Sequence, residues 1–212
     1  ATFDILLQTT RRLAREVLFP AYRAMDTAPP TFESGRVRVH PVMHTIYPRL
    51  VDLGLINATR PAEVGGSRLP LTLHTMALAY LLAANLGAAG FTFLTTGAAH
   101  LIEAFCSDAL KETYMARMYA GEWTGTMALT EPQAGSSLSD VTATATPTGS
   151  GHYLLRGEKT FISGGDQDLT ENIVHLVLAR IQARPPASRE CRCSWSRASA
   201  PRVALSSRTT SR

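Results

Sequence analysis

The sequence is poor in cysteine. Its three cysteines are Cys106, Cys191 and Cys193, and the last two lie too close in sequence for an easy disulfide bond. No histidine lies near that pair, so neither a disulfide framework nor a zinc site is expected. A reducing, cytoplasmic setting is the expectation. The residues Ala1–Asp4 also lack the basic segment that begins a signal peptide.

Charge is scarce and unevenly placed. Charged residues make up 18% of the 212 residues, and the formal net charge is +4. Seven arginines and one glutamate lie between Gln182 and Arg212, so residues 1–181 carry a net charge of −2. We therefore expect no nucleic-acid-binding surface on the body of the protein.

One long stretch has no charge at all. It runs from Leu69 to Ile102 and is long enough to cross a bilayer. Pro70, Asn85 and Gly87, with further glycines, threonines and histidines, divide it into pieces of ordinary helix length. We expect buried core helices and no membrane span, and a membrane-associated helical protein is the alternative.

The first half of the chain shows helical periodicity. Apolar spacing predicts helices over 3–26, 42–53, 71–86, 91–105 and 107–120, with loops over 28–35 and 57–68. Pro20 and Pro48 are expected to kink or divide the first two helices. Gly54 and Gly121 are expected to end the second and the last.

After Trp123 the pattern changes to short segments rich in Thr, Val, Ile, Leu and Tyr, separated by turn residues. We expect strands over 124–129, 141–147, 152–156, 160–163 and 172–180, joined by hairpin turns. The expected fold class is α+β: an N-terminal all-helical domain (1–121), an incomplete antiparallel middle β domain (122–181) and a basic tail (182–212).

Two segments carry the functional signal. The first, Met127–Ser137 (MALTEPQAGSS), is named here the TEP motif; it predicts a strand entering a turn fixed by Pro132 and Gly135. Backbone N–H groups and hydroxyls of such a turn can bind a pyrophosphate or the edge of a flavin ring. The second, Gly157–Gly165 (GEKTFISGG), is named the FIS motif. There Phe161 and Ser163 are two apart on an expected strand, so a planar ring could stack on one and accept a hydrogen bond from the other.

Taken singly, a serine-rich loop and a core phenylalanine are the simpler interpretations. Together, TEPxAGS followed about twenty residues later by GxKxxIS resembles the middle domain of the acyl-CoA dehydrogenase family. The flanks 121–126 and 168–180 are most similar to the large prokaryotic subgroup that includes methylthiopropanoyl-CoA dehydrogenase. The resemblance covers nearly all of residues 1–181.

The resemblance implies an FAD-dependent oxidoreductase of fatty acid metabolism. Members take the α-proton of an acyl-CoA with a carboxylate, pass the β-hydrogen to flavin N5 as hydride, and give the electrons to an electron-transfer flavoprotein. They assemble as homo-oligomers. Carried onto this chain, the cofactor contacts are Met127, Leu129, Thr130, Gly135, Ser136, Phe161, Ile162 and Ser163. Ser136 is also a candidate contact of the acyl-CoA, and Ser163 would lie near N5.

The chain departs from the family pattern in two places. Ser137 stands where the family commonly has Asp. The family's catalytic base comes from a C-terminal helical domain that this chain lacks, so no catalytic residue is assigned. Four glutamates are expected to be surface charges or local caps: Glu103, Glu112, Glu122 and Glu131.

The tail from Gln182 to Arg212 shows no helical or strand period and is expected to be disordered or translated out of frame. In the shifted frame Glu190–Cys191 can encode only Met or Val, and Arg192–Cys193 only Leu, Met or Val. We therefore hypothesise a frame change near Ile181 that truncates the enzyme. The fragment is expected to be inactive and to bind FAD weakly or not at all; the alternative function is a non-catalytic helical interaction module.

Overall fold

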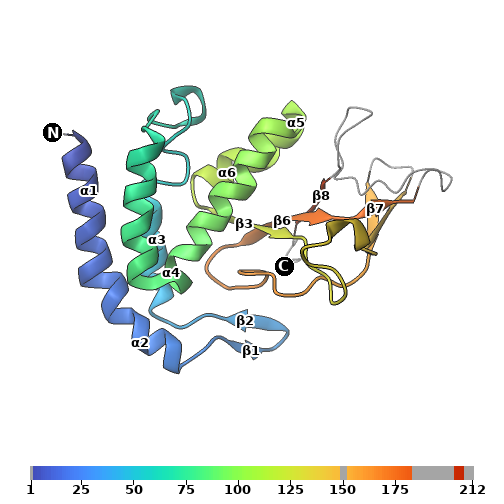
Figure 1. The fold of residues 1–212 in the computed structure, drawn as a ribbon, viewed down its shortest axis with the longest axis horizontal. Helices are drawn as coiled ribbons and strands as arrows, with labels where there is room; N and C mark the ends of the chain where they lie inside the picture. The colour runs from blue at the N-terminus through green and yellow to red at the C-terminus, as the bar shows by residue number, and fades with distance from the viewer. Residues whose placement is uncertain (1, 149–151, 183–202, 208–212) are drawn as a thin grey trace.

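The computed structural model describes residues 2–148 and 152–182, with the backbone of a strand at 203–207. Helices gather on one side of the molecule and most of the strands on the other (Figure 1). The described helices are α1 (Thr2–Leu13), α2 (Phe19–Thr27), α3 (Met43–Asp52), α4 (Leu71–Phe105), α5 (Asp108–Leu110) and α6 (Ala116–Tyr119). Shorter turns are the π turns η1 (Ala14–Leu18) and η3 (Lys111–Met115) and the 3₁₀ turns η2 (Ala62–Val64) and η4 (Leu138–Asp140).

The two helical prolines behave differently. Pro20 lies in the first turn of α2, directly after the π turn η1, where its missing N–H and its ring are accommodated. The first helix is therefore divided as expected, and the π turn η1 separates α1 from α2. Pro48 lies inside α3, which is one continuous helix, so of the expected kink or division the division does not occur.

Helix α4 joins the two helices expected over 71–86 and 91–105. Its one non-helical residue is Asn85 (φ −162°, ψ 93°). The Asn85 Oδ1 atom accepts the Ala88 N–H at 3.0 Å, as the N-cap residue of a new helix does. The expected break is thus confirmed, but it occupies one residue, and Gly87 and Gly90 are helical.

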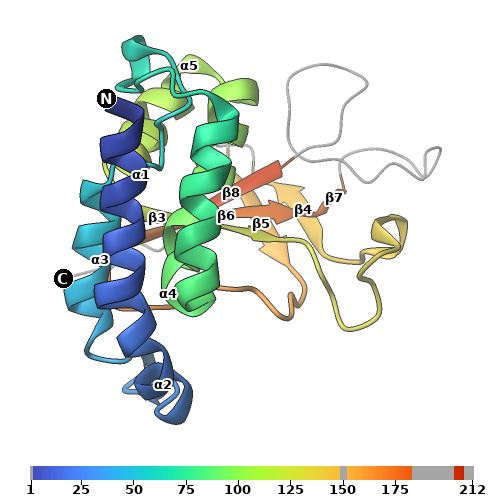
Figure 2. The same cartoon turned by 60° about the vertical axis from the view of Figure 1, so that its left-hand side comes forward.

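The α4 helix is the centre of the core. Its buried residues pack against α1 and α3 in one cluster, and against α6 and the sheet in another. Figure 2 shows α4 in front of the strands and beside α1. By length and composition α4 is the helix, among the described residues, that could cross a membrane, with a mean hydropathy of 1.6. In this fold it packs as a core helix.

The strands are β1 (Thr31–Glu33), β2 (Arg36–Arg38), β3 (Trp123–Ala128), β4 (Thr144–Pro147), β5 (Tyr153–Arg156), β6 (Asn172–Leu178), β7 (Arg180–Ile181) and β8 (Val203–Ser207). They form a β1–β2 hairpin and two three-stranded sheets, ordered β3-β6-β8 and β5-β4-β7. The α+β class is confirmed. Antiparallel pairing holds for β4–β5 and β6–β8, whereas β3–β6 and β4–β7 are parallel.

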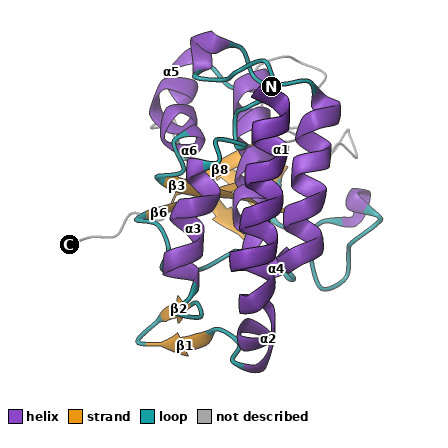
Figure 3. Ribbon diagram, turned by 90° about the vertical axis from the view of Figure 1, so that its left-hand side faces the viewer, coloured by secondary structure: helices purple, strands orange, loops and turns teal. Residues whose placement is uncertain are grey.

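Three local expectations differ from the structure. The loop expected over 28–35 contains β1 and the turn of the β1–β2 hairpin, which lies beside α2 at one end of the molecule (Figure 3). Residues 160–163, expected to be a strand, are loop. Strand β8 lies within the tail expected to be disordered or out of frame. The codons that motivate the frame hypothesis fall on residues 190–195, outside the described residues.

Sheet and helices approach closely at Gly125 in β3. A Cβ atom there would lie 2.5 Å from Met118 Cε and 2.7 Å from Ala98 Cβ. The Gly125 N–H also donates to Thr95 Oγ1 of α4 at 3.0 Å. Glycine at this position therefore lets β3 lie directly on α4, which positions the TEP motif.

Candidate functional site

The structure brings the two motifs into direct contact. The Thr160 N–H of the FIS motif donates to the Thr130 carbonyl of the TEP motif at 3.0 Å. The Lys159 ammonium donates to the Leu129 carbonyl at 2.9 Å and to Glu131 Oε1 at 2.8 Å. Segments that lie almost thirty residues apart thus form one corner of the β domain.

Glu131, a residue that is only 3% exposed, places its carboxylate at the centre of this corner. Besides Lys159 it accepts the N–H groups of Thr142 (2.6 Å) and Ala143 (3.0 Å) and the Gln133 amide (2.7 Å). Burial alone would raise the pKa of Glu131. The hydrogen bonds from Lys159 and from the two N–H groups outweigh burial and lower the pKa from 4.5 to about 2. The expectation that Glu131 is a charge on a helix face or a local cap is wrong, because the residue is buried and joins Lys159 of the second motif to the N–H groups of Thr142 and Ala143.

The first three predicted cofactor residues lie where β3 enters this corner. Met127 is partly exposed on the side of β3 that faces α4; a Cβ on Gly97 would be 4.0 Å from its Cε. Leu129 is partly buried and packs on a small β-domain cluster. Thr130 is partly buried, and its carbonyl holds the FIS motif.

Gly135 and Ser136 lie in an exposed turn. The turn is closed by reciprocal backbone bonds between Glu131 and Ala134, at 2.7 and 3.1 Å. Gly135 and Ser136 follow this closure, so the turn presents them to solvent. A phosphate-bearing ligand could reach them there.

Phe161 and Ser163 do not share a strand face, so that expectation is wrong. Phe161 has a φ of +56° and is 93% exposed, and this left-handed conformation turns the chain out of an extended path. Ile162 is partly buried, and its carbonyl accepts the Gly165 N–H at 3.1 Å, which closes a turn at Ser163. The phenylalanine ring is nevertheless available for stacking.

A glycine sets the path of the FIS motif. Gly157 has a φ of +148°, and a Cβ there would lie 2.7 Å from Ala143 Cα. Since Ala143 also donates to Glu131, the glycine brings the motif against the segment that fixes the buried carboxylate.

The loop after the FIS motif is anchored by polar residues that the sequence analysis did not single out. Asp166 Oδ2 accepts the Val37 N–H and Asp168 Oδ1 accepts the Val39 N–H, both at 3.1 Å. Asp168 also lies 3.2 Å from Arg38. Two carboxylates that are two residues apart thus accept two N–H groups that are also two residues apart. In the sequence, the only sign of this anchor is the triplet Asp166-Gln167-Asp168.

The residues fit one side of a flavin site. The exposed Phe161 ring offers a stacking surface, and Thr160 Oγ1 is buried without a hydrogen-bond partner in the described part of the chain. Glu131 is held in an ion pair, and Glu103 in bonds to Arg60 and Tyr119. Neither carboxylate is therefore available to remove a proton. Among residues 2–148 and 152–182, no group of three His, Cys, Asp or Glu could hold a metal.

Comparison with known proteins identifies the family. The model of the acyl-CoA dehydrogenase N-terminal domain matches residues 2–122. The 3-methylmercaptopropionyl-CoA dehydrogenase of Ruegeria pomeroyi is 40% identical over 183 residues, which is 86% of this chain and 31% of that protein. A butyryl-CoA dehydrogenase of Syntrophomonas wolfei is 35% identical over 194 residues, 90% of this chain and 32% of that protein.

A solved structure has the same fold. The acyl-CoA dehydrogenase complexed with FAD from Bacillus anthracis matches with a TM-score of 0.69 and 23% identity, over 85% of this chain and 29% of that one. The chain spans about a third of the length of the curated relatives. Its helical half, its β domain and these matches together show that the chain belongs to the acyl-CoA dehydrogenase family.

Proposed function

We propose that this chain is the N-terminal and part of the middle portion of an FAD-dependent acyl-CoA dehydrogenase, and that it forms one wall of the flavin site. The observation that carries the proposal is the junction of Lys159 with Glu131 and Leu129. It places the exposed Phe161 ring and the open turn at Gly135 and Ser136 on one corner. A bound FAD would supply the acceptor for the hydride taken from the acyl-CoA.

The chain's own residues would bind and orient. Phe161 would provide the stacking surface, and the Ser163 hydroxyl would donate a hydrogen bond to the ring edge. Ser136 in the exposed turn would bind a phosphate of FAD or of the acyl-CoA. Met127, on the side of β3 that faces α4, would form part of the wall shared with α4.

The chain alone is proposed to be inactive. It covers about a third of its curated relatives, and the carboxylates of Glu103 and Glu131 are held in hydrogen bonds. The rest of the enzyme would supply the base and the other wall of the flavin site. Electron transfer to an electron-transfer flavoprotein, a homo-oligomeric state and a cytoplasmic location belong to this proposal.

A chimera tests it. Residues 2–181 would replace the matching segment of the Ruegeria pomeroyi relative, and flavin absorbance and acyl-CoA-dependent dye reduction would be measured. We expect a yellow, active chimera, and no dye reduction by the 212-residue chain alone. The intact relative is the positive control. A folded chimera without flavin would refute the proposal that this chain forms one wall of the flavin site. Turnover by the chain alone would refute the proposal that the rest of the enzyme is needed for activity.

A further inference from the structure

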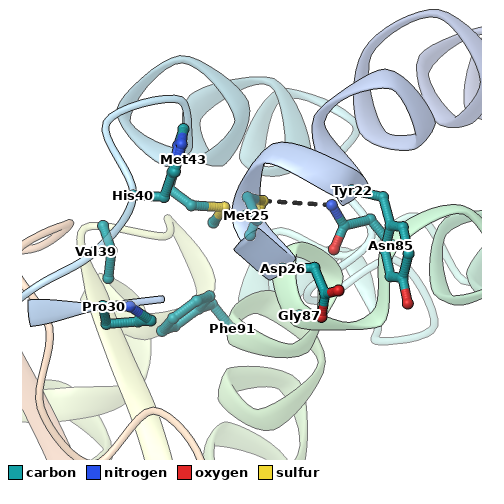
Figure 4. A pocket seen from close by; sticks show the side chains of 10 residues that line it. All are labelled: Tyr22, Met25, Asp26, Pro30, Val39, His40, Met43, Asn85, Gly87 and Phe91. Atoms are coloured by element: carbon teal, nitrogen blue, oxygen red, sulfur yellow. Dashed lines mark hydrogen bonds between the residues drawn. The ribbon is translucent and has the colours of Figure 1, made fainter. Parts of the chain in front are cut away.

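A pocket of about 310 Å³ lies at the other end of the helical half. It is bounded by α2, by the segment between β2 and α3, and by the break in α4 (Figure 4). It shares no lining residue with the two motifs. Nothing in the proposed function therefore uses it.

Two helix irregularities meet at this pocket. Asn85, the non-helical residue of α4, lines it, and the Asn85 Nδ2 atom donates to the Leu18 carbonyl and to Met25 Sδ, both at 3.3 Å. Leu18 ends the π turn η1. Interruptions of this kind cost free energy and are enriched at functional sites. Here a side chain of one interruption bonds to the backbone of the other and holds α2 against α4.

The lining of the pocket is apolar and aromatic with one acidic group. Met43 is 1% exposed and forms part of the floor. Figure 4 shows Phe91 on one side, beside Pro30, with Tyr22 and the Asp26 carboxylate on the other. None of the ten lining residues is Lys or Arg. Mostly apolar pockets with few polar groups are the usual form of small-molecule sites.

We propose that this pocket binds a small organic cation, such as an alkylammonium or quaternary ammonium group. Tyr22 and Phe91 bring two aromatic rings to the lining, and cations bind to the faces of such rings. Asp26 supplies the opposing charge at the exposed rim, while Met25 adds a polarisable sulfur. An anion would meet the Asp26 carboxylate without a lysine or arginine partner in the lining.

One histidine, His40, also lines the pocket and takes part in a local turn. His40 Nδ1 accepts the Val42 N–H at 3.1 Å, so its lone pair is used in a local turn. Asp26 is the one carboxylate among the ten lining residues.

The test uses the 212-residue chain and two probes of the same shape. Choline carries the cation, and 3,3-dimethylbutan-1-ol replaces its nitrogen with carbon. Binding would be measured by isothermal titration and by ligand-observed NMR. We expect saturable binding of choline and weaker binding of the alcohol. Asp26→Asn should weaken choline binding about fivefold, as expected for loss of one partly exposed ion pair, and leave alcohol binding unchanged.

Matched variants separate charge at the pocket from charge elsewhere. Asp52→Asn makes the same change on α3, away from this pocket, and should leave choline binding unaltered. Tyr22→Leu keeps an apolar wall and should weaken choline binding more than alcohol binding. Equal binding of the two probes, or no choline binding to a chain with a helical circular dichroism spectrum, would overturn the proposal. Neither readout depends on flavin, so this outcome is independent of the chimera.

Discussion

Glu131 and Lys159 form a buried ion pair at the point where the two motifs meet. The side chain of Glu131 is 1% exposed and that of Lys159 is 12% exposed. Burying two charges is unfavourable, and the additional N–H donors at Thr142 and Ala143 offset that cost. Removing one partner leaves the other charge buried and uncompensated. This ion pair is therefore the single interaction on which the contact between the two motifs depends most.

Glu131→Gln should therefore lower the free energy of unfolding by about 3 kcal/mol at neutral pH, as expected for breaking a buried pair from one side. The measurement is urea denaturation followed by circular dichroism. Glu122→Gln is the control, because that residue is exposed. An equal loss in both variants would show that general charge, and not the junction, is responsible.

The same pair predicts an acid dependence. The pKa of Glu131 is lowered from 4.5 to about 2, so its stabilisation is fully present above pH 4.5 and is lost as the pH falls toward 2. The difference between the wild-type chain and Glu131→Gln should shrink over that interval. Denaturation curves at several pH values check this, and a constant difference would contradict the ionised state of Glu131.

At the scale of elements, the contact of β3 with α4 fixes the site against the helical half. Gly125→Ala would place a methyl group within 2.7 Å of Met118 and Ala98. We expect a loss of about 1–3 kcal/mol, as for other overpacked cores. Gly90→Ala is the matched control: it lies in α4 with no heavy atom within 4 Å of its added Cβ. That variant should be neutral or slightly more stable, and thermal unfolding compares the two.

The β1–β2 hairpin supports the loop that follows the FIS motif. Asp168→Asn removes the charge that binds the Val39 N–H and Arg38, while the isosteric amide keeps the shape. Hydrogen bonds to charged groups contribute about 1.5–3 kcal/mol, so the Val39 amide should exchange about tenfold faster or more. Hydrogen exchange followed by NMR measures it. Asp140→Asn on an exposed turn is the control, and unchanged Val39 exchange would contradict the role given to Asp168.

The sequence predicts those elements that are formed by interactions between residues close together in the chain. Helical periodicity located every long helix, because i, i+4 spacing is local. The β1–β2 hairpin was missed because its side chains are almost all exposed, so no alternation of polar and apolar residues marks it. The parallel pairing of β3 with β6 was missed because the identity of a strand's partner is not local.

In the candidate site, too, local features could be predicted and contacts between distant residues could not. The spacing of the FIS motif predicts one strand face for Phe161 and Ser163, but it does not predict the positive φ at Phe161 that ends the extended path. The pairing of Glu131 with Lys159 spans 28 residues. No spacing rule links two such positions, so the residue that organises the site was expected to be peripheral.

At the scale of the whole molecule, the chain covers a third of its relatives and exposes sheet edge and apolar side chains. Strand β5 lies at the edge of the described β5-β4-β7 sheet, and Leu154 on it is 67% exposed. Open edges with exposed apolar residues pair with other chains. Self-association of the 212-residue chain through this edge is therefore expected.

Leu154→Lys should reduce that association, because a lysine on an edge strand opposes pairing with a second edge. Leu71→Lys is the matched control: Leu71 is 70% exposed and begins the helix α4. Both variants add one positive charge, so a general charge effect would change them equally. Sedimentation velocity over a range of concentrations distinguishes the cases. A selective gain of monomer in Leu154→Lys would place the contact at β5, and equal behaviour of the two variants would remove the edge as its cause.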